Sequence, residues 1–251
     1  MRPATLYNEA RVARGTDGAQ RDVFRNVIRR ALDAGIPFAV GGFHALAAHT
    51  GQKRKSKDLD LYVVPSDHKR MIGATVEAGL SDYYGVAPYD RRWIYRSHRD
   101  GVIVDVIWAM ANYRAEVDRV WLEAGPEIHV AGFRLRALPA EEALWTRLYV
   151  LQRDRCDWPD ILNLLAAAGP GMDWKRLAER LGEDLPLLAA VMGVFAWLDP
   201  WRAARLPACA WRLLRHAAPL KPSEAPPVRR SVLLDARRWY VGGSPPKGRL
   251  N

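Results

Sequence analysis

The stretch GGFHALAAHTGQKRKSKDLDLYVV (residues 41–64) connects a glycine pair to a segment that begins with two carboxylates. Asp58 and Asp60 alternate with leucines, and this alternation predicts a β-strand in which residues two apart point to the same side. The two carboxylates therefore stand together at the start of an otherwise apolar strand. The glycine pair follows IPFAV (residues 36–40), a short apolar run that predicts another, buried strand.

A later strand supplies a third carboxylate. VIVDVIWAM (residues 102–110) is apolar almost throughout, which is typical of a central strand, and its one charged residue is Asp105. A lone aspartate in such a strand is costly unless it is paired or bound to a cation. If this strand lies beside residues 58–64, Asp58, Asp60 and Asp105 converge, and like charges that close raise one another's pKa.

A divalent cation would remove that repulsion. Magnesium prefers carboxylate oxygens together with substrate phosphates, and two such ions can clamp the attacking and leaving oxygens of a phosphoryl displacement. Gly41 and Gly42 open an expected short helix; glycine lets the backbone approach a phosphate closely, and a helix N-terminus favours anions. We therefore expect two Mg²⁺ ions at the three aspartates and a nucleoside triphosphate at the glycine pair.

The pattern changes after Pro139. Before it, apolar periodicity and turn residues predict helices alternating with strands, and Asp100-Gly101 is a strong hairpin signal. After it the chain is strongly helical, apart from an end rich in Pro and Gly. We predict an α+β (α/β) fold in two domains, a catalytic domain at residues 1–137 and an all-helical domain at residues 138–251. The expected elements are helices at residues 21–35, 43–51, 65–79, 140–169 (interrupted near Pro159), 174–181 and 187–197, strands at 36–40, 58–64, 93–98 and 102–110, and a hairpin at 127–138.

The order strand, glycine pair, helix, Asp-x-Asp strand and Asp strand resembles the DNA polymerase beta-like nucleotidyltransferase superfamily. The segments that carry the resemblance are VGGFHALAAHTGQKRKSKDLDLYV and VIVDVI. It implies a mixed sheet with flanking helices, two Mg²⁺ ions bound by Asp58, Asp60 and Asp105, and a triphosphate held by Gly41 and Gly42. The chain departs from the pattern in its long spacer of 15 residues between Gly42 and Asp58, and in a second glycine where serine is commoner.

The segment RLYVLQRDRCDWPDILNLL (residues 147–165) resembles a helical motif of nucleotidyltransferases related to the toxins of abortive-infection (type IV) toxin–antitoxin systems. A Lys, an Arg and two Asp of that motif correspond to Arg147, Arg153, Asp157 and Asp160. The resemblance implies phosphate contacts for Arg147 and Arg153 and a role as base for Asp157. Arginine keeps the positive charge of the usual lysine but cannot transfer a proton. The alternative is that the four residues form ion pairs on one helix face.

Charge is unevenly distributed along the chain. Residues 200–251 contain 11 Lys or Arg and 2 Asp or Glu, so this part carries +9 of the net charge of +10. Such a basic segment suggests RNA, especially a tRNA end, as a partner, although a solvated tail explains the charge equally well. Ser56 and Lys57 lie in a basic loop and are candidates for contacts with the triphosphate; a purely solvated loop is the alternative.

Composition points to a protein of the cytoplasm. Two cysteines make neither a disulfide framework nor a zinc motif, and the N-terminus shows no apolar signal region. The longest apolar run, residues 185–198, is too short to span a bilayer and predicts a buried helix, so no membrane contact is expected.

The sequence supports three hypotheses for function. The first is an Mg²⁺-dependent enzyme that moves a nucleoside monophosphate from an NTP such as ATP to an acceptor hydroxyl, with RNA or protein as favoured acceptor and an aminoglycoside-type small molecule as alternative. The second is a non-catalytic, antitoxin-like module that binds nucleotide or nucleic acid. The third is a toxin whose cognate partner protein is encoded nearby.

Overall fold

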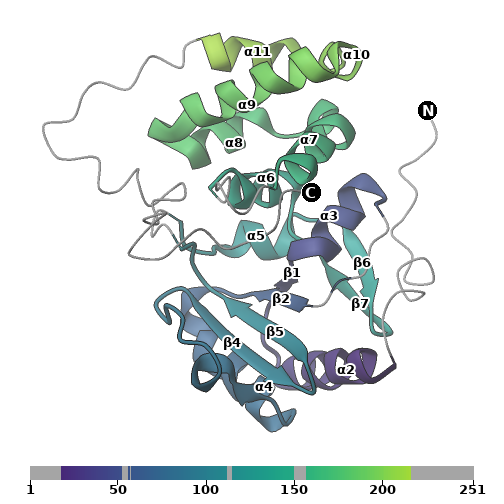
Figure 1. Cartoon of the computed structure of the whole chain (residues 1–251), viewed down its shortest axis with the longest axis vertical. Coiled ribbons are helices and arrows are strands. Elements are labelled where there is room, and N and C mark those ends of the chain that lie inside the picture. Colours follow the sequence, from purple (N-terminus) through teal and green to yellow (C-terminus); the bar gives the residue numbers. More distant parts are fainter. Residues whose placement is uncertain (1–17, 53–55, 57, 112–114, 150–156, 216–251) are drawn as a thin grey trace, which may run out of the picture.

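The computed structural model describes residues 18–52, 56, 58–111, 115–149 and 157–215. It contains a five-stranded mixed sheet, which lies in the lower half of Figure 1. The strand order is β1-β2-β5-β4-β3. β2 and β5 run parallel, and the other neighbours run antiparallel. The fold class predicted from the sequence is confirmed. The strands are β1 (Ala39–Val40), β2 (Asp58–Tyr62), β3 (Ser81–Asp82), β4 (Ile94–Arg99) and β5 (Val102–Ile107).

The expected strands are present, but several are shorter than the apolar runs that predict them. β1 begins only at Ala39, and Pro37 before it has no N–H to donate to a neighbouring strand. β3 is absent from the sequence-based expectation because Ser81 and Asp82 form a two-residue edge strand without apolar alternation. The expected hairpin at residues 127–138 forms a separate pair, β6 (Glu127–Val130) and β7 (Phe133–Arg136).

Four helices flank the sheet (Figure 1). α2 (Gly18–Asp33) and α4 (His68–Glu77) pack on each other and on β5. The buried stripe of α2, which includes Val23, Val27 and Ile28, is the one that helical periodicity predicts. α3 (Gly42–Thr50) and the short α5 (Arg119–Glu123) lie between the sheet and the remaining helices.

Every described element from α6 onward is helical. α3 contacts both α6 and α7, and one continuous set of buried apolar side chains, from Val104 in the sheet to Leu164 and Phe195, runs through both parts of the chain. The division after residue 137 stays a prediction. The helices are α6 (Ala140–Leu148), α7 (Trp158–Ala167), α8 (Trp174–Leu181), α9 (Leu185–Leu198), α10 (Pro200–Ala203) and α11 (Ala208–Arg215).

One described stretch, Trp174–Leu198, is long and apolar enough to cross a membrane by length and composition. A single stretch of this kind is weak evidence, because core helices of soluble proteins have the same composition. In the structure a short 3₁₀ turn that starts at Gly182 separates α8 from α9. α9 is only partly the buried helix that its composition predicts: Val191 and Phe195 are in the core, whereas Trp197 is 81% exposed.

Candidate active site

The parallel pairing of β2 with β5 brings the carboxylates together. Asp60 and Asp105 are direct partners across the two strands. Because Asp58 and Asp60 are two residues apart on β2, both side chains point to the same face of the sheet as Asp105. The residues between them, such as Leu59 and Val104, are fully buried on the opposite face. The expectation that these two strands are neighbours is confirmed.

The glycine pair lies against the same carboxylates. The Gly41 N–H donates to the Asp60 carbonyl at 2.9 Å, and α3 starts at the next residue. A Cβ added to Gly42 would lie 1.7 Å from Asp60 Oδ2, and one added to Gly41 would lie 2.1 Å from the ring of Tyr62. Gly42 also has a φ of +52°. Only glycine fits at these positions, so the start of α3 and the carboxylates form one site.

Burial and neighbouring charge act on Asp60. Desolvation, followed by the negative charges of Asp105 and Asp58, raises the pKa of Asp60 to about 7, and the positive charges of Arg147 and Arg96 oppose this shift. A carboxylate with such a pKa carries a proton about half of the time near neutral pH. Burial and the two like charges therefore disfavour the ionised form of Asp60, and a divalent cation would relieve this repulsion.

Arg96 is a site residue that the sequence analysis missed. It stands opposite Asp105 on β4, with Nε donating to Oδ1 at 2.8 Å and Nη2 donating to Oδ2 at 2.6 Å. This bidentate pair, together with the charges of the other two aspartates, raises the pKa of the Arg96 guanidinium. The Asp100-Gly101 hairpin signal could have revealed it, because a two-residue turn there fixes the pairing of residue 96 with residue 105.

The donor set suits a hard cation such as Mg²⁺, because three carboxylates share one face beside a helix N-terminus. As the side chains stand, however, no three Asp, Glu, His or Cys groups within the described part of the chain are arranged to share a metal ion. Both oxygens of Asp105 are instead bonded to Arg96. The three carboxylates are suitable ligands for the metal, but in this arrangement Arg96 occupies both oxygens of Asp105.

Arg147 connects the helical part of the chain to the glycine pair. Its Nη2 donates to the Gly42 carbonyl at 2.8 Å, and its Nη1 donates to the Ala143 carbonyl at 2.9 Å within α6. Its Nε lies 3.7 Å from Asp160 Oδ2 of α7. Arg147 and Asp160 are both buried, so this ion pair is an interior contact. It holds the guanidinium that is hydrogen-bonded to the Gly42 carbonyl.

The other predicted site residues are placed less directly. Ser56 Oγ donates to the Asp58 carbonyl at 2.7 Å, so the hydroxyl braces the start of β2. Asp157 is half-buried just before α7 and accepts the Ile161 N–H with its backbone carbonyl. Lys57 and Arg153 lie outside the described residues. Roles for these four residues in nucleotide binding or proton transfer stay predictions.

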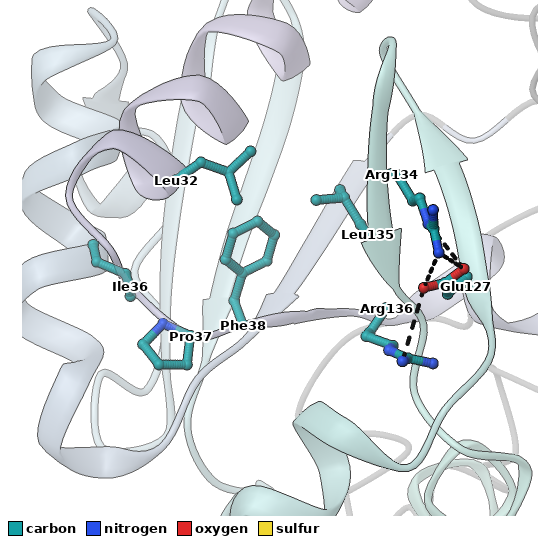
Figure 2. A pocket seen from close by; sticks show the side chains of 8 residues that line it. All are labelled: Leu32, Ile36, Pro37, Phe38, Glu127, Arg134, Leu135 and Arg136. Atoms are coloured by element: carbon teal, nitrogen blue, oxygen red, sulfur yellow. Dashed lines mark hydrogen bonds and ion pairs between the residues drawn. The ribbon is translucent and has the colours of Figure 1, made fainter.

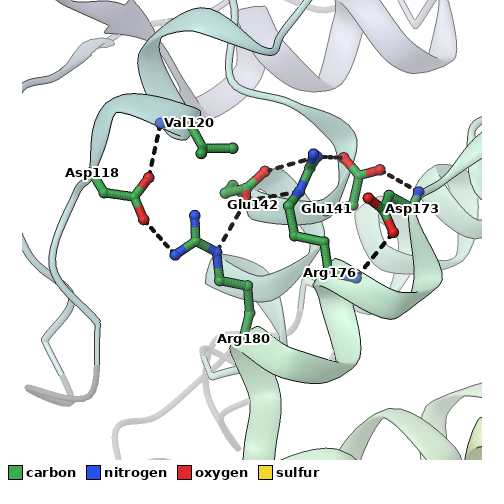
Figure 3. Close-up of polar contacts among 7 residues, drawn as sticks. All are labelled: Asp118, Val120, Glu141, Glu142, Asp173, Arg176 and Arg180. Carbon is green, nitrogen blue, oxygen red and sulfur yellow. Dashed lines mark hydrogen bonds and ion pairs between the residues drawn. The ribbon is translucent and has the colours of Figure 1, made fainter.

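A network of charged side chains centred on the buried Glu141 and Glu142 holds α6 in place (Figure 3). Arg176 of α8 reaches Glu141 Oε2 at 2.5 Å and Glu142 Oε1 at 3.4 Å. Arg180 pairs with the same Glu142 oxygen at 3.2 Å and with Asp118 Oδ2 at 2.5 Å. Asp118 in turn accepts the Val120 N–H at the start of α5. Since α6 also carries Arg147, this network fixes the helix that supports the glycine pair.

A pocket elsewhere on the molecule holds none of the predicted site residues (Figure 2). It lies between the end of α2, the segment leading into β1 and the β6–β7 hairpin. Leu32, Phe38 and Leu135 provide its apolar lining, and Arg134 pairs with Glu127 at its edge. Arg136, the third charged residue of the lining, lies 3.8 Å from the same Glu127 carboxylate, so both arginines share one acid.

Comparisons with known proteins identify the family of the chain. A family model described as uncharacterised nucleotidyltransferase matches residues 5–195, well over half of the chain. No curated protein gives a significant match to the sequence.

Solved structures give similarities at low sequence identity. The crystal structure of ANT(2″)-Ia in complex with adenylyl-2″-tobramycin is 16% identical and has a TM-score of 0.50, covering 71% of this chain and 99% of that one. The solution structure of the same antibiotic-resistance factor is 20% identical with a TM-score of 0.48, covering 74% and 97%. A putative nucleotidyltransferase from H. pylori is 16% identical with a TM-score of 0.36, covering 79% and 95%. The similarity at a TM-score of 0.50 concerns the fold.

Proposed function

The chain belongs to this family of uncharacterised nucleotidyltransferases, and we propose that it transfers a nucleoside monophosphate from an NTP to an acceptor hydroxyl in an Mg²⁺-dependent reaction. The observation that carries the proposal is the pairing of Asp60 with Asp105 across parallel strands, with Gly42 packed against the Asp60 carboxylate. These residues place an anion-binding helix start and a cluster of carboxylates in direct contact.

Each part of the site has a proposed role. Asp58, Asp60 and Asp105 would hold the Mg²⁺ ions, which supply positive charge that stabilises the phosphate oxygens and the leaving pyrophosphate. Gly42 presents its backbone N–H group at the start of α3 to the triphosphate. Gly41, whose own N–H is bonded to the Asp60 carbonyl, lets the phosphates approach the backbone closely. Arg147 fixes Gly42 through its carbonyl. Ser56, Lys57 and Arg153 are further proposed contacts for the nucleotide.

The proposed reaction is a single displacement at the α-phosphorus. The acceptor oxygen forms a bond to that phosphorus, the bond to the bridging oxygen breaks, and pyrophosphate leaves with the electron pair. The proton of the acceptor hydroxyl passes to a carboxylate. Asp157 is the first candidate for this base and Asp105 the second, since both Asp105 oxygens already accept bonds from Arg96.

RNA, in particular a tRNA end, is the proposed acceptor. The support is the charge of +9 on residues 200–251, which would attract a polyanion. A protein hydroxyl is an alternative in the same scheme. A toxin-like role, in which the transfer disables an RNA and a cognate partner protein controls it, is a further proposal. Its support is the resemblance of residues 147–165 to the motif of the toxin-related nucleotidyltransferases. We propose the cytoplasm as the site of action.

A small-molecule acceptor of the aminoglycoside type is the second candidate. The observation that favours it is the similarity in fold to a protein solved in complex with adenylyl-2″-tobramycin. A non-catalytic binding module is the third candidate, although the presence of all three carboxylates argues against it. The three candidates differ in where a transferred nucleotide would be found.

A label-transfer experiment separates them. The full-length protein with Mg²⁺ would be incubated with each α-labelled NTP and total RNA, or with an aminoglycoside panel, and compared with the Asp58→Asn/Asp60→Asn variant. Asp33→Asn, an exposed aspartate at the end of α2, is the control. If RNA or protein becomes labelled with the wild type and with the control, but not with Asp58→Asn/Asp60→Asn, the result supports transfer to RNA or protein, the first candidate. Label on the small molecule supports the second, and no label on any acceptor supports the binding module.

A further inference from the structure

Arg96 is a positive side chain bonded directly to the carboxylate cluster. It comes from β4, the strand on the far side of β5 from β2, and reaches Asp105 in a bidentate pair. Asp105 is 4% exposed in this pair, whereas the Arg96 side chain is 36% exposed. The acid is therefore fixed in the interior while its partner extends toward solvent.

The pair uses the part of Asp105 that a metal ion would need. A guanidinium that donates to both oxygens of a carboxylate occupies the edge at which a cation would coordinate. Magnesium and a guanidinium brought to one carboxylate also repel each other, by several kcal/mol if both stay within about 5 Å at an effective dielectric constant of about 20. The two cations cannot both hold Asp105 closely.

The surroundings of Arg96 allow its side chain to leave without disturbing the strand. The Tyr89 hydroxyl accepts the Arg96 backbone N–H at 3.0 Å and lies 3.3 Å from the Arg96 carbonyl. These bonds hold the backbone of β4 independently of the guanidinium. The guanidinium carbon already lies 6.0 Å from the centroid of the Tyr83 ring, so an aromatic face lies beside the cation.

We propose that Arg96 is a built-in counter-ion of the carboxylate cluster that competes with the divalent cation for Asp105 and is displaced when the cation binds. This inference rests on the proposed function, in which the three aspartates hold Mg²⁺. Arg96 neutralises part of the cluster during folding and lowers its affinity for a cation that arrives alone. It acts through Asp105 and is a positioning residue.

Binding of Mn²⁺ tests the proposal without turnover. Mn²⁺ favours the same oxygen ligands as Mg²⁺, and its free form is measured directly by electron paramagnetic resonance during titration of the full-length protein. We expect Arg96→Gln to bind Mn²⁺ at least about tenfold more tightly than the wild type, because the competing charge is gone. Arg92→Gln is the matched control: it removes an arginine that pairs with the exposed Asp90, and its affinity should equal that of the wild type.

A thermal shift gives a second readout. Without Mn²⁺, Arg96→Gln should unfold at a lower temperature than the wild type, because three carboxylates then share the site without their counter-ion. Saturating Mn²⁺ should raise its unfolding temperature by more than it raises that of the wild type. If Arg96→Gln does not fold in either condition, the Mn²⁺ affinity of Arg96→Lys tests the proposal instead. Because one ammonium group cannot occupy both oxygens of Asp105, this variant should bind Mn²⁺ about threefold more tightly than the wild type.

The outcomes separate this inference from the proposed function. The competition is overturned if Arg96→Gln binds Mn²⁺ no more tightly than the wild type. The same holds for Arg96→Lys if that variant has to replace Arg96→Gln. The metal site itself stands in either case, provided that Asp60→Asn loses Mn²⁺ binding. A wild type that binds no Mn²⁺, with Asp60→Asn indistinguishable from it, overturns both the metal-dependent function and the inference.

Discussion

At the scale of single residues, Gly42 and Asp60 depend on each other. The carboxylate of Asp60 occupies the space where any other residue at position 42 would place its Cβ. This explains in physical terms why the second glycine cannot be the serine common in the superfamily without moving the acid. The contact also keeps an ionisable group away from water beside two like charges, which is the origin of its raised pKa.

Replacing Gly42 tests this contact. Gly42→Ala should abolish nucleotidyl transfer and destabilise the fold by about 2–4 kcal/mol, because strain at a positive φ adds to a collision with Asp60. Gly51→Ala is the matched control at the other end of α3: its φ is +70°, but nothing lies within 4 Å of the added Cβ. Urea unfolding should show a cost of about 1 kcal/mol for the control. Equal costs for both variants would contradict the packing argument.

The pKa of Asp60 gives a prediction for the dependence of stability on pH. Folding raises this pKa from 3.8 to about 7, so between these values the native state holds a proton that the unfolded state has lost. Stability should therefore fall as pH rises from about 4 to about 7 and then level off.

Asp60→Asn removes this titration. In the presence of a chelator, urea unfolding at pH 8 should find the variant more stable than the wild type by roughly 1–3 kcal/mol, with the difference vanishing near pH 4. Activity should be lost in the same variant. An unchanged difference across this pH range would show that Asp60 titrates normally.

At the scale of elements, the site depends on strand register and on the support of α6. The two-residue turn at Asp100-Gly101, with φ values of +52° and +77°, sets β4 against β5 so that Arg96 faces Asp105. The parallel register of β2 and β5 then sets Asp60 beside Asp105. On the other side, the buried charges of Glu141 and Glu142 tie α6 to α8.

Removing one member of that network should be costly. Glu142 is buried, and burial already raises its pKa. Arg176→Gln removes one of the positive charges that stabilise its ionised form. We expect a loss of about 2–4 kcal/mol in urea unfolding. The neighbouring Lys175→Gln is the control, because Lys175 pairs with Glu179 only at the exposed surface and should cost less than about 0.5 kcal/mol. A similar loss for both would mean that the network is not what holds α8.

The elements also show how far the sequence predicts the fold. Alternation in DLDL and the apolar run of β5 predict two strands and the face on which each carboxylate lies, because local patterns determine which face a side chain occupies. The three carboxylates converge only if the two strands are neighbours, which these patterns do not determine and the structure shows. Arg96 was missed although the turn fixes its position. The Arg147–Gly42 contact joins residues 105 apart, and the Arg176–Glu142 pair joins two helices. Contacts of this kind depend on tertiary packing that periodicity does not carry.

At the scale of the whole molecule, the distribution of charge separates a nearly neutral first part from a basic end. Residues 216–251 alone contain seven Lys or Arg and two Asp or Glu. If RNA is the acceptor, a chain ending at residue 215 should bind RNA more weakly and show a shallower dependence of affinity on salt, because fewer phosphates are neutralised.

The truncated chain also has an internal control. The proposed nucleotide site is made of residues before position 165, so binding of the labelled NTP should be retained. Filter binding of RNA at 50 and 200 mM salt measures both the affinity and the slope. If the RNA affinity and its salt dependence are unchanged, residues 216–251 do not contribute to RNA binding. That result would favour an acceptor that carries no phosphate chain.

The central claim is that the carboxylates and glycine pair transfer a nucleotide rather than only bind one. The most direct measurement compares α-labelled and γ-labelled NTP in parallel reactions of the wild type with Mg²⁺ and total RNA. We predict that α-label moves to the acceptor while γ-label is released as pyrophosphate, and that Asp60→Asn does neither. γ-label on the acceptor, or tight binding of both labels without release, would contradict it.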